Sequence, residues 1–577
     1  MDAYKKYIPA EVTNLPLMLK NSVKQFPSRP SLTSVDGTEY SYEELDRASQ
    51  HVAVMLKSAG VSKDDKVAIL AENSPHWGIA YFGTLICGAT TVPILPDFRA
   101  VEVRSILEHA GAKTVFVSGK LISRLNEGLP GSVEMVINTD DFQLLEVNKG
   151  VVSETAGVSG ALTKLQVESK ISVESKGYYE ADGDDLASII YTSGTTGRSK
   201  GVMLTHTNIL SNAVQSGTVH QVLPEDRFLS VLPLAHSYEC TIGMMVTLLN
   251  GAMVQYIDRA PTAAYLGPVL KKLKPTTMLT VPLIIEKIYR STIRPKLSNS
   301  APMRLLMKFG PTRKLLSKAA VKKLMDFFGG QIRFFGVGGA PLAPDVEKFL
   351  LEGGFPYAIG YGLTETSPML AGFNPSTAVF HSVGKIMEGV SVRIDHPDPV
   401  TKEGEIVVKG SNVMKGYYKD EEKTREVFTE DGYFRTGDLG IIDKKGIIYI
   451  KGRSKNMILG PNGENIYPEE IEAVINSREN VSESLVMEYK GKLTAMVHLK
   501  MELIEEQLQH LKENAAEYKK QLQVKADEAL KELMIHVNQH VSRNSKLQSM
   551  VRQVQPFEKT ATHKIKRFLY TRRSNDN

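Results

Sequence analysis

The chain has 577 residues, more than a single hydrophobic core usually spans, so at least two domains are expected. Its 42% hydrophobic and 23% charged residues are ordinary for a soluble globular protein, and a net charge of +5 gives no argument for nucleic acid as a partner. The only cysteines, Cys87 and Cys240, stand in apolar runs without zinc spacing, which indicates buried side chains rather than a disulfide or a metal site.

No segment of the chain predicts export or membrane insertion. Residues 1–7 lack the apolar core of a signal peptide, and no stretch of eighteen apolar residues occurs. The longest apolar stretch, Thr241 to Val254, is too short and contains Asn250, which predicts a buried helix and strand. A reducing, cytoplasmic location is therefore expected.

From residue 1 to about residue 270, short apolar runs alternate with helical stretches. Such runs are Val67–Leu70, Thr91–Ile94, Thr114–Val117 and Glu134–Asn138. This alternation predicts an α/β architecture with largely parallel sheets.

A loop of small polar residues follows the buried strand expected at Leu186–Ile190. The loop reads Tyr191-Thr-Ser-Gly-Thr-Thr-Gly-Arg-Ser-Lys-Gly201. Glycines let backbone N–H groups turn toward a ligand, while hydroxyls and Lys200 can contact phosphate oxygens. Because Lys200 precedes Gly201 and no Ser or Thr follows, this is not the loop of P-loop kinases and GTPases. A flexible surface loop is the alternative, but eleven patterned residues after a strand favour a polyphosphate site.

The segment from Lys271 to Lys323 is strongly basic. It contains fourteen Lys and Arg residues against one acid, Glu286, and apolar residues interleave with them. A solvated helical face around a core stripe is the common explanation for such a run. A peripheral contact with an anionic membrane surface is the alternative.

Two further segments carry glycines beside polar or aromatic residues. Phe334-Phe-Gly-Val-Gly-Gly-Ala-Pro341 lacks the third glycine and the acidic residue of a dinucleotide loop, so alone it indicates only a strand-to-helix turn. Tyr357-Ala-Ile-Gly-Tyr-Gly-Leu-Thr-Glu-Thr366 places an aromatic ring near Glu365, a possible Mg²⁺ ligand. A glutamate that simply faces solvent is the alternative for Glu365.

Residues 380–450 change character and predict an antiparallel sheet or a small barrel. Val390–Ile394, Glu405–Val408 and Ile447–Ile450 are short β-type runs broken by Gly and Asp. Among them, Asp431-Gly-Tyr-Phe-Arg-Thr-Gly-Asp-Leu-Gly440 carries Asp438, whose two oxygens could accept both hydroxyls of a ribose. A β-turn at this Gly-Asp pair is compatible with that role.

A domain boundary is predicted at Lys451–Asn456, which gives a large domain of residues 1–453 and a small domain of residues 454–577. In the small domain, Pro468–Ile475 predicts a helix with proline in its first turn. Residues 503–543 form a long charged helical run, either a helical hairpin or an interaction arm. Near the C-terminus, Lys559-Thr-Ala-Thr-His-Lys-Ile-Lys-Arg567 is basic, and a basic surface tail is the simplest explanation for it.

In this order, the segments resemble the motifs of the ANL superfamily of adenylate-forming enzymes, over residues 15 to 570. Ala71–Ala80, Lys274–Pro282 and Glu286-Lys287 look most like long-chain fatty acid–CoA ligases. The resemblance implies an α/β fold: a large N-terminal domain of two α/β sheet subdomains plus a distorted β-barrel, and a small mobile C-terminal α+β domain.

The resemblance also implies an ATP site. Catalytic roles fall to Lys564, Thr195, Lys200 and Glu365, with Glu365 holding Mg²⁺. Lys564 is assigned from its Lys-Ile-x-Arg frame, although His563 stands where the family usually has glycine. Tyr361 would stack on adenine, Thr364 would contact the α-phosphate, and Arg453 would contact the ribose together with Asp438. The other nucleotide contacts would come from Thr192, Ser193, Gly194, Thr196, Gly197, Gly338, Gly339, Ala340, Pro341 and Gly362.

Two further sites and a hinge follow from the same resemblance. Leu232-Pro-Leu-Ala-His-Ser-Tyr-Glu239 borders an acyl pocket, with His236 at its gate and Tyr238 in its wall. The loop Gly460–Pro468 would line a coenzyme A channel through Gly463, Glu464 and Asn465. Lys455 would be the hinge between the two domains.

The implied activity is ATP-dependent conversion of a fatty acid, of long chain by resemblance, to acyl-AMP and then to acyl-CoA. Carrier-protein ligation, an aryl or medium-chain acid, and a non-catalytic nucleotide- or lipid-binding relative stay open. The implied partners are fatty acid, ATP with Mg²⁺, and coenzyme A, without nucleic acid. A homodimer and peripheral contact with the inner membrane face through residues 271–323 also stay open.

Overall fold

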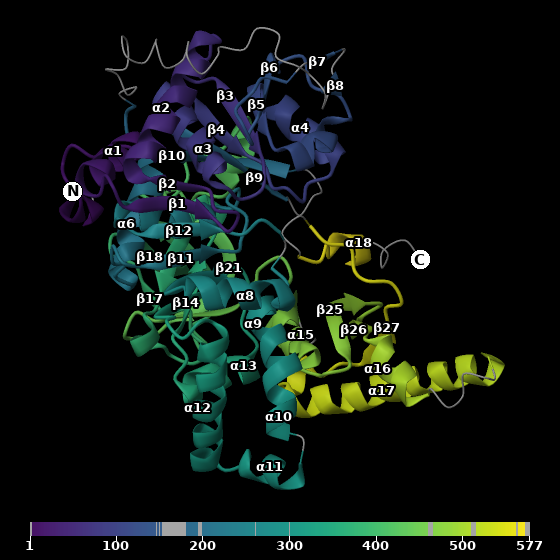
Figure 1. The fold of residues 1–577 in the computed structure, drawn as a ribbon. Coiled ribbons are helices and arrows are strands. Elements are labelled where there is room, and N and C mark those ends of the chain that lie inside the picture. Colours follow the sequence, from purple (N-terminus) through teal and green to yellow (C-terminus); the bar gives the residue numbers. More distant parts are fainter. Residues whose placement is uncertain are drawn as a thin grey trace.

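The computed structural model describes residues 3–145, 147–148, 151–152, 181–193, 199–259, 261–298, 300–459, 465–508, 515–560 and 564–571. A large unit built on three sheets is followed by a smaller C-terminal unit (Figure 1). Some predicted site groups lie outside the described residues: the side chain of Ser193, and Gly194, Thr195, Thr196, Gly197, Gly463 and Glu464.

The first sheet has seven strands in the order β20-β10-β9-β4-β3-β5-β6. The strands from β9 to β6 are parallel, and β10 and β20 add an antiparallel edge. The alternation of apolar runs therefore predicted this sheet correctly. Its strands are β3 (Lys66–Leu70), β4 (Thr90–Pro93), β5 (Ala112–Val117), β6 (Met135–Asn138), β9 (Leu186–Ser193), β10 (Ser199–Thr205) and β20 (Gly416–Tyr417).

The second sheet has nine strands in the order β17-β16-β15-β14-β13-β11-β12-β1-β2. It is parallel from β15 to β1 and antiparallel at both edges. Its strands are β1 (Pro30–Ser34), β2 (Glu39–Ser41), β11 (Arg227–Ser230), β12 (Met253–Tyr256), β13 (Thr277–Thr280), β14 (Phe334–Val337), β15 (Tyr357–Gly362), β16 (Met369–Gly372) and β17 (Lys385–Ile386).

Helices fill the space between the two sheets and cover their outer faces (Figure 1). α3 (Pro75–Cys87) touches β1 of one sheet and β3 and β4 of the other, and every residue except His76 is buried. Such a helix is apolar on all sides because it has no solvent face. The other helices of this part are α1 (Leu15–Gln25), α2 (Tyr42–Ser58), α4 (Ala100–Ala110), α6 (His206–Val219), η3 (Tyr238–Met245), α7 (Val246–Leu249), α8 (Ala263–Leu273), α9 (Pro282–Ile288) and α13 (Pro344–Gly353).

The region predicted to be antiparallel forms a four-stranded sheet in the order β18-β19-β21-β22. Every neighbouring pair in it is antiparallel. The register of β21 and β22 sets Asp438 directly opposite Arg453, at the end of the sheet where the large unit stops. The strands are β18 (Ser391–Asp395), β19 (Gly404–Lys409), β21 (Phe434–Ile442) and β22 (Ile448–Arg453), with the short helix α14 (Glu421–Glu426) before β21.

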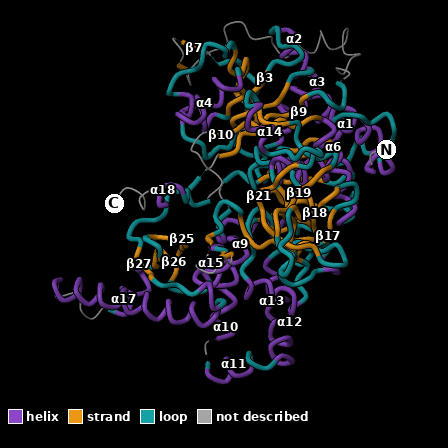
Figure 2. Tube along the Cα trace, turned by 180° about the vertical axis from the view of Figure 1, so that it is seen from behind, coloured by secondary structure: helices purple, strands orange, loops and turns teal. Residues whose placement is uncertain are grey.

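The C-terminal unit is a three-stranded sheet covered by helices. Its sheet has the order β25-β26-β27, and α17 packs Ala526, Leu533 and Val537 into the same core as α15. Within the predicted helical run of 503–543, α16 and α17 contact each other, and α17 extends away from the body (Figure 2). The elements are β23 (Ile458–Leu459), β24 (Asn465–Ile466), α15 (Pro468–Asn476), β25 (Val481–Tyr489), β26 (Lys492–Leu499), α16 (Met501–Gln507), α17 (Ala515–His540), β27 (Ser549–Arg552) and α18 (Phe568–Thr571).

Polar contacts join the C-terminal unit to the large unit. Arg294 donates to the carbonyl of Ser477 at 3.0 Å, and Arg290 donates to the carbonyl of Asn476. These carbonyls end α15, where the helix dipole is negative, so two arginines are favourable partners there. On the other side, the Tyr467 hydroxyl donates to Glu403 at 2.9 Å.

Within the described residues, no helix combines the length and the apolar character that crossing a membrane requires. Both cysteines are buried and unpaired, as their apolar surroundings predicted.

Candidate functional site

The predicted phosphate loop joins two paired strands. β9 and β10 are antiparallel neighbours, and their register sets Lys200 opposite Thr192. Both strands lie inside the seven-stranded sheet, which fixes the two ends of the loop, while Gly194 to Gly197 lie outside the described residues. Lys200 therefore stands on a strand, and its position is set by backbone pairing.

Lys200 is tied to Glu365 through an aromatic side chain. Its Nζ lies 5.0 Å from the ring centroid of Tyr417, a cation–π distance, and the Tyr417 hydroxyl donates to Glu365 Oε1 at 2.9 Å. Burial lowers the pKa of Lys200, and the ammonium groups of Lys423 and Lys455 lower it further. The phosphate-loop lysine and the predicted magnesium ligand thus belong to one cluster.

Asp438 is a buried carboxylate with two partners. The Tyr361 hydroxyl donates to its Oδ2 at 2.7 Å, and Arg453 Nε lies 2.8 Å from its Oδ1. Burial raises the pKa of Asp438 above its ordinary value, while Arg453 and Tyr361 act against that shift. Three residues predicted for the nucleoside therefore form one hydrogen-bonded group, with Asp438 in the middle of β21 and Tyr361 and Arg453 near the ends of β15 and β22.

The turn that presents Thr364 and Glu365 requires a glycine at one position. A Cβ on Gly362 would stand 1.8 Å from the carbonyl oxygen of Pro368, far inside van der Waals contact. The following residues, Thr364 to Thr366, form the one-turn helix η5, and Thr366 Oγ1 accepts from the amide of Leu363 at 3.0 Å. This tight return places Thr364 in the interior, 9% exposed, beside Glu365.

Tyr238 lies against the backbone of the second glycine segment. A Cβ on Gly338 would be 3.0 Å from Tyr238 Cζ, and one on Gly336 would be 3.1 Å from its hydroxyl oxygen. The absence of a side chain at Gly336 and at Gly338 is what makes room for this ring. Gly339, Ala340 and Pro341 follow at the exposed end of the strand, open to a ligand.

His236 is a buried neutral imidazole. Its Nδ1 accepts from the amide of Tyr238 at 3.2 Å. Burial lowers the pKa of His236 to about 4, and the ammonium of Lys564 acts in the same direction. His236 therefore carries no charge near neutral pH.

Lys564 reaches into the site from the C-terminal unit. Its backbone forms a turn with Thr560, with an amide-to-carbonyl bond of 2.8 Å from Thr560 to Lys564. Lys564 is exposed as a residue, yet desolvation of its ammonium lowers its pKa, and the charge of Arg453 lowers that pKa further. The carboxylates of Asp438 and Glu365 act in the opposite direction and raise the pKa of Lys564. The C-terminal lysine thus faces the same charged groups as Lys200.

The predicted hinge residue Lys455 occupies a turn between β22 and β23. The amide of Ser454 donates to the carbonyl of Gly437 at 2.9 Å, and that of Asn456 donates to Arg453 at 3.0 Å. Of the predicted coenzyme A loop, Asn465 is exposed in β24, whereas Gly463 and Glu464 lie outside the described residues.

The residues around Glu365 fit a magnesium ion that is coordinated mostly by phosphate oxygens and water rather than by the protein. One carboxylate oxygen of Glu365 accepts the hydrogen bond from Tyr417. In the described part of the chain, no group of three or more His, Cys, Asp or Glu side chains could hold a metal ion. Mg²⁺ typically takes one or two protein carboxylates and completes its shell with phosphate oxygens and water. A single carboxylate that shares Tyr417 with Lys200 matches that pattern.

Sequence reasoning did not single out Tyr417. The short run Gly416-Tyr417-Tyr418 has no local feature that indicates a site. Its role follows only from the pairing of β20 with β10 beside Lys200. A pairing between residues more than two hundred positions apart cannot be obtained from local patterns.

Comparison with known proteins places this geometry in a family. The model of the AMP-binding enzyme family matches residues 19–418. The chain belongs to this family, the adenylate-forming group that its motifs resemble. The predicted resemblance is therefore confirmed at the level of the family.

Similar curated proteins cover most of the chain. The long-chain-fatty-acid–CoA ligase FadD15 of Mycobacterium bovis is 30% identical over 78% of this chain and 76% of its own length. The peroxisomal long chain acyl-CoA synthetase 7 of Arabidopsis thaliana is 29% identical over 82% and 71%. A chloroplastic long-chain-fatty-acid–[acyl-carrier-protein] ligase of Arabidopsis thaliana, AEE15, is also 29% identical, over 78% and 70%.

Solved structures share the fold. The o-succinylbenzoate CoA synthetase of Bacillus subtilis, in complex with its acyl-adenylate intermediate, gives a TM-score of 0.71 at 22% identity over 97% of this chain and 98% of that one. This likeness confirms the predicted fold class, with its large N-terminal and small C-terminal domains.

The lowered pKa values of Lys200 and Lys564 predict how ATP binding depends on pH. Each ammonium attracts phosphate only while protonated, so the affinity for Mg-ATP should fall as pH rises through these pKa values, below the ordinary lysine value of about 10.4. The fall should approach about tenfold per pH unit for each proton involved. Titration calorimetry between pH 7 and 10 measures it.

Two variants test whether Lys564 causes this loss of Mg-ATP affinity at high pH. Lys564→Arg keeps its charge, so its affinity should persist to higher pH, whereas Lys566→Arg should behave as the unaltered protein. An affinity that stays constant to pH 10 in the unaltered protein would contradict the role of both lysines.

Proposed function

We propose that this protein is an acyl-CoA synthetase: it joins a fatty acid to AMP at the expense of ATP, and then transfers the acyl group to coenzyme A. The observation that carries the proposal is the convergence of Lys200, Glu365, Asp438 and Lys564 from four separate segments. The family membership and the names of the curated relatives support the same reaction.

In the first half-reaction, a carboxylate oxygen of the acid attacks the α-phosphorus, and the bond to pyrophosphate breaks. Negative charge on the phosphate oxygens must be neutralised, and Lys200 and Lys564 supply two ammonium groups for it. Bound Mg²⁺ would add Lewis-acid charge at the phosphates beside Glu365. Asp438, fixed by Tyr361 and Arg453, would orient the ribose through its carboxylate oxygens.

In the second half-reaction, the thiol of coenzyme A attacks the acyl carbonyl and AMP leaves. Lys564 fills the site from the C-terminal unit, so this unit must turn away before the thiol can enter. Lys455 lies in the turn that joins the units, and Gly463, Glu464 and Asn465 would then line the thiol channel. Hinges of this kind concentrate rotation at a few loop positions.

The acid is proposed to be a long-chain fatty acid. The names of the relatives from Mycobacterium bovis and Arabidopsis thaliana support this length, and the buried gate at His236 and Tyr238 is uncharged near neutral pH. An acyl-carrier-protein acceptor is the second candidate, because AEE15 is equally similar. Aryl or medium-chain acids, and a non-catalytic relative, are outcomes that the assay below separates.

The assay measures pyrophosphate release with ATP, Mg²⁺ and palmitate, and then AMP formation with and without coenzyme A. We expect pyrophosphate with fatty acids, and AMP formation that depends on coenzyme A rather than on acyl carrier protein. Absence of pyrophosphate with every acid of a C2–C18 and aryl panel would contradict the proposal.

Lys564→Ala should separate the two half-reactions. Loss of its ammonium should slow pyrophosphate release by about 100-fold or more, as removal of one preorganised charge partner typically does. Thioester formation from preformed acyl-adenylate should stay within a few-fold of the unaltered protein. Rapid-quench measurement of each half-reaction tests this.

Lys566→Ala is the matched control for this experiment, since it removes a lysine from the same segment outside the charged cluster. An equal loss of both half-reactions in Lys564→Ala, or a loss as large in Lys566→Ala, would refute the assignment.

The protein is further proposed to work in the cytoplasm and to contact the inner membrane face through part of the basic segment. α10 (Arg294–Ser298), α11 (Ala301–Leu306) and α12 (Gly310–Phe327) project from the large unit (Figure 1). The tip surface is the exposed set of apolar and basic residues on this projection: Arg304, Leu305, Leu306, Lys308, Phe309, Lys314, Leu315 and Lys318.

The internal contacts of other basic residues support the tip surface as the part of the basic segment proposed to meet the membrane. Arg290 and Arg294 donate to α15, and Arg313 forms two 2.7 Å bonds with Glu352 of α13, so these three serve internal contacts. Phe309 is 59% and Leu315 70% exposed, and no acidic residue occurs between Glu286 and Asp326. Exposed apolar side chains among lysines match the interface of an anionic lipid surface.

Phe309→Ser combined with Leu315→Ser should weaken binding to vesicles of phosphatidylcholine and phosphatidylglycerol by at least about tenfold, because two apolar side chains no longer enter the lipid. Added salt should weaken the unaltered protein as well, since the lysines are screened. Vesicle flotation measures both effects.

Val400→Ser is the control, because Val400 is 85% exposed at a turn between β18 and β19. Vesicle binding that is unchanged by added salt and by the Phe309→Ser and Leu315→Ser substitutions would refute the membrane contact. A dimer that dissociates in the double variant, seen by sedimentation, would assign the surface to a second copy of the chain.

A further inference from the structure

Lys564 lies beside a short stretch of paired backbone in the C-terminal unit. Lys559 pairs with Ile565 in an antiparallel bridge. The amide of Lys566 donates to the carbonyl of Glu558 at 2.8 Å, so two arms of the chain lie side by side. These arms fix the backbone of Lys564, and the contacts that hold the arms therefore decide where its ammonium can reach.

The first arm is tied to β25 near the surface. Lys559 Nζ lies 2.6 Å from Glu483 Oε2, and the amide of Phe557 donates to Glu483 Oε1 at 3.1 Å. The Lys559 side chain is 40% exposed, and exposed ion pairs contribute little. The Phe557 ring packs edge-on against Tyr570 of α18, with centroids 5.1 Å apart. This arm is therefore held mainly by packing.

The second arm is tied to the interior of the unit by Arg567, the arginine of the Lys-Ile-x-Arg frame. Its Nη2 donates to Glu472 Oε2, and its Nη1 donates to the carbonyl of Val486 at 3.2 Å. The other oxygen of Glu472 accepts from the amide of Val486 at 2.6 Å. Glu472 is 9% exposed, so a buried carboxylate joins α15, β25 and this arm. Loss of either charged partner would leave the other without its counter-charge.

The helix that carries Glu472, α15, is held at both ends. It lies between the large unit and β25 (Figure 1). At its start, Asn456 of the turn after β22 donates to Glu469 Oε1 at 2.6 Å. At its end, Arg290 and Arg294 of the large unit donate to its C-terminal carbonyls. Because a helix is a rigid element, the docking of α15 on the large unit also sets the position of Glu472.

The chain from Lys564 to Arg567 is short. Three residues span at most about 11 Å even when fully extended. In this arrangement the ammonium of Lys564 is within electrostatic reach of Arg453, Asp438 and Glu365. A fixed Arg567 therefore confines Lys564 to the neighbourhood of these groups.

We propose that Glu472 and Arg567 are positioning residues for acid activation, because their ion pair links the docked α15 to the segment of Lys564. Neither residue needs to touch ATP or the acid, since both act through the ammonium of Lys564. When the C-terminal unit turns away for thioester formation, the pair turns with it, so the second half-reaction does not depend on the pair. The inference rests on the proposed acyl-activating function.

Arg567→Gln and Glu472→Gln test the proposal, with both half-reactions measured by rapid quench. Pyrophosphate release with ATP, Mg²⁺ and palmitate should fall at least about tenfold, mainly in kcat, since displacement of a catalytic group by about 1 Å can cost about 100-fold. Thioester formation from preformed palmitoyl-adenylate should stay within a few-fold. Arg567→Lys keeps a charged donor and should recover part of the lost rate. An equal loss of both half-reactions would overturn the proposal.

A double-mutant cycle tests whether Arg567 acts through Lys564. In Lys564→Ala protein, the addition of Arg567→Gln should lower pyrophosphate release by less than about twofold, because the ammonium that Arg567 positions is already gone. Additive losses would give Arg567 a separate role and overturn the proposal.

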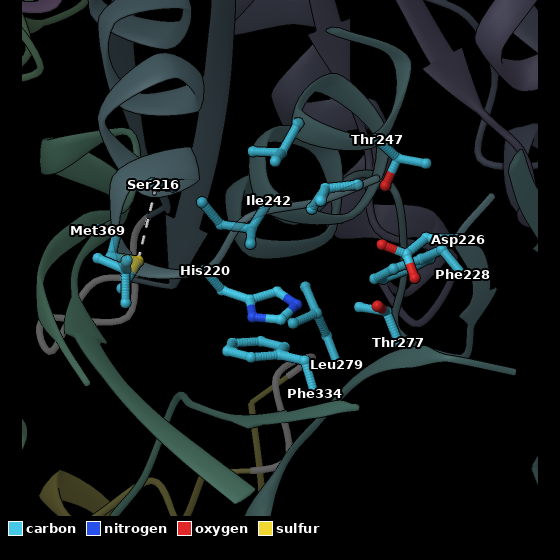
Figure 3. A pocket seen from close by; sticks show the side chains of 13 residues that line it. Ser216, His220, Asp226, Phe228, Ile242, Thr247, Thr277, Leu279, Phe334 and Met369 are labelled. Carbon is cyan, nitrogen blue, oxygen red and sulfur yellow. Dashed lines mark hydrogen bonds between the residues drawn. The ribbon is translucent and has the colours of Figure 1, made fainter. Parts of the chain in front are cut away.

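Two controls separate positioning from stability. Arg543→Gln removes an exposed arginine of the same unit, in η8 (Arg543–Ser545), and should change neither half-reaction. Phe228 lines a largely apolar cavity of about 40 Å³ between α6, η3 and the nine-stranded sheet (Figure 3). Phe228→Leu enlarges this cavity and should lower the melting temperature, yet keep the ratio of the two half-reactions. A ratio that shifts as far in either control as in Arg567→Gln would overturn the positioning role.

Amine labelling tests the positioning without turnover. In the unaltered protein, bound Mg-ATP should protect the Lys564 amine from acetylation by acetic anhydride, read by mass spectrometry, and Arg567→Gln should lose this protection. Protection that persists in Arg567→Gln would overturn the proposal. If protection behaves as expected but no acid releases pyrophosphate, the proposed acyl activation fails and the positioning role stands.

Discussion

The buried carboxylate of Asp438 is the constraint on which the site depends. A buried charge is tolerated only with partners, and Asp438 has Tyr361 from the nine-stranded sheet and Arg453 from the end of β22. The β21–β22 register sets Asp438 opposite Arg453, so the pair forms as soon as this sheet does. One carboxylate thus fixes the relative position of two sheets and the starting point of the C-terminal unit.

Around this carboxylate, cations outnumber anions. Lys423 and Lys455 lower the pKa of Lys200, while Arg453 lowers the pKa of Lys564 and the carboxylates of Asp438 and Glu365 raise it. Such mutual repulsion costs stability, and a polyanionic ligand relieves it. In the proposed reaction, the same repulsion would favour departure of Lys564 once pyrophosphate has left, because the negative charge that holds it would then be reduced.

Local patterns predicted most of the fold. Val67–Leu70, Thr114–Val117 and Leu186–Ile190 all became strands of the seven-stranded sheet, and Pro468–Ile475 became α15, because burial and helix-start signals act over a few residues. Tyr417 was missed because its place near Lys200 arises from the pairing of β10 with β20, two segments that lie far apart in the sequence.

The predicted acyl gate is packed against the glycine segment at the end of β14. Tyr238 opens η3, two residues after His236. Gly336 and Gly338 carry no side chain where the Tyr238 ring lies, and a Cβ at either position would stand within 3.1 Å of that ring or its hydroxyl. Because packed side chains do not deform independently, these two glycines fix where the Tyr238 ring can lie.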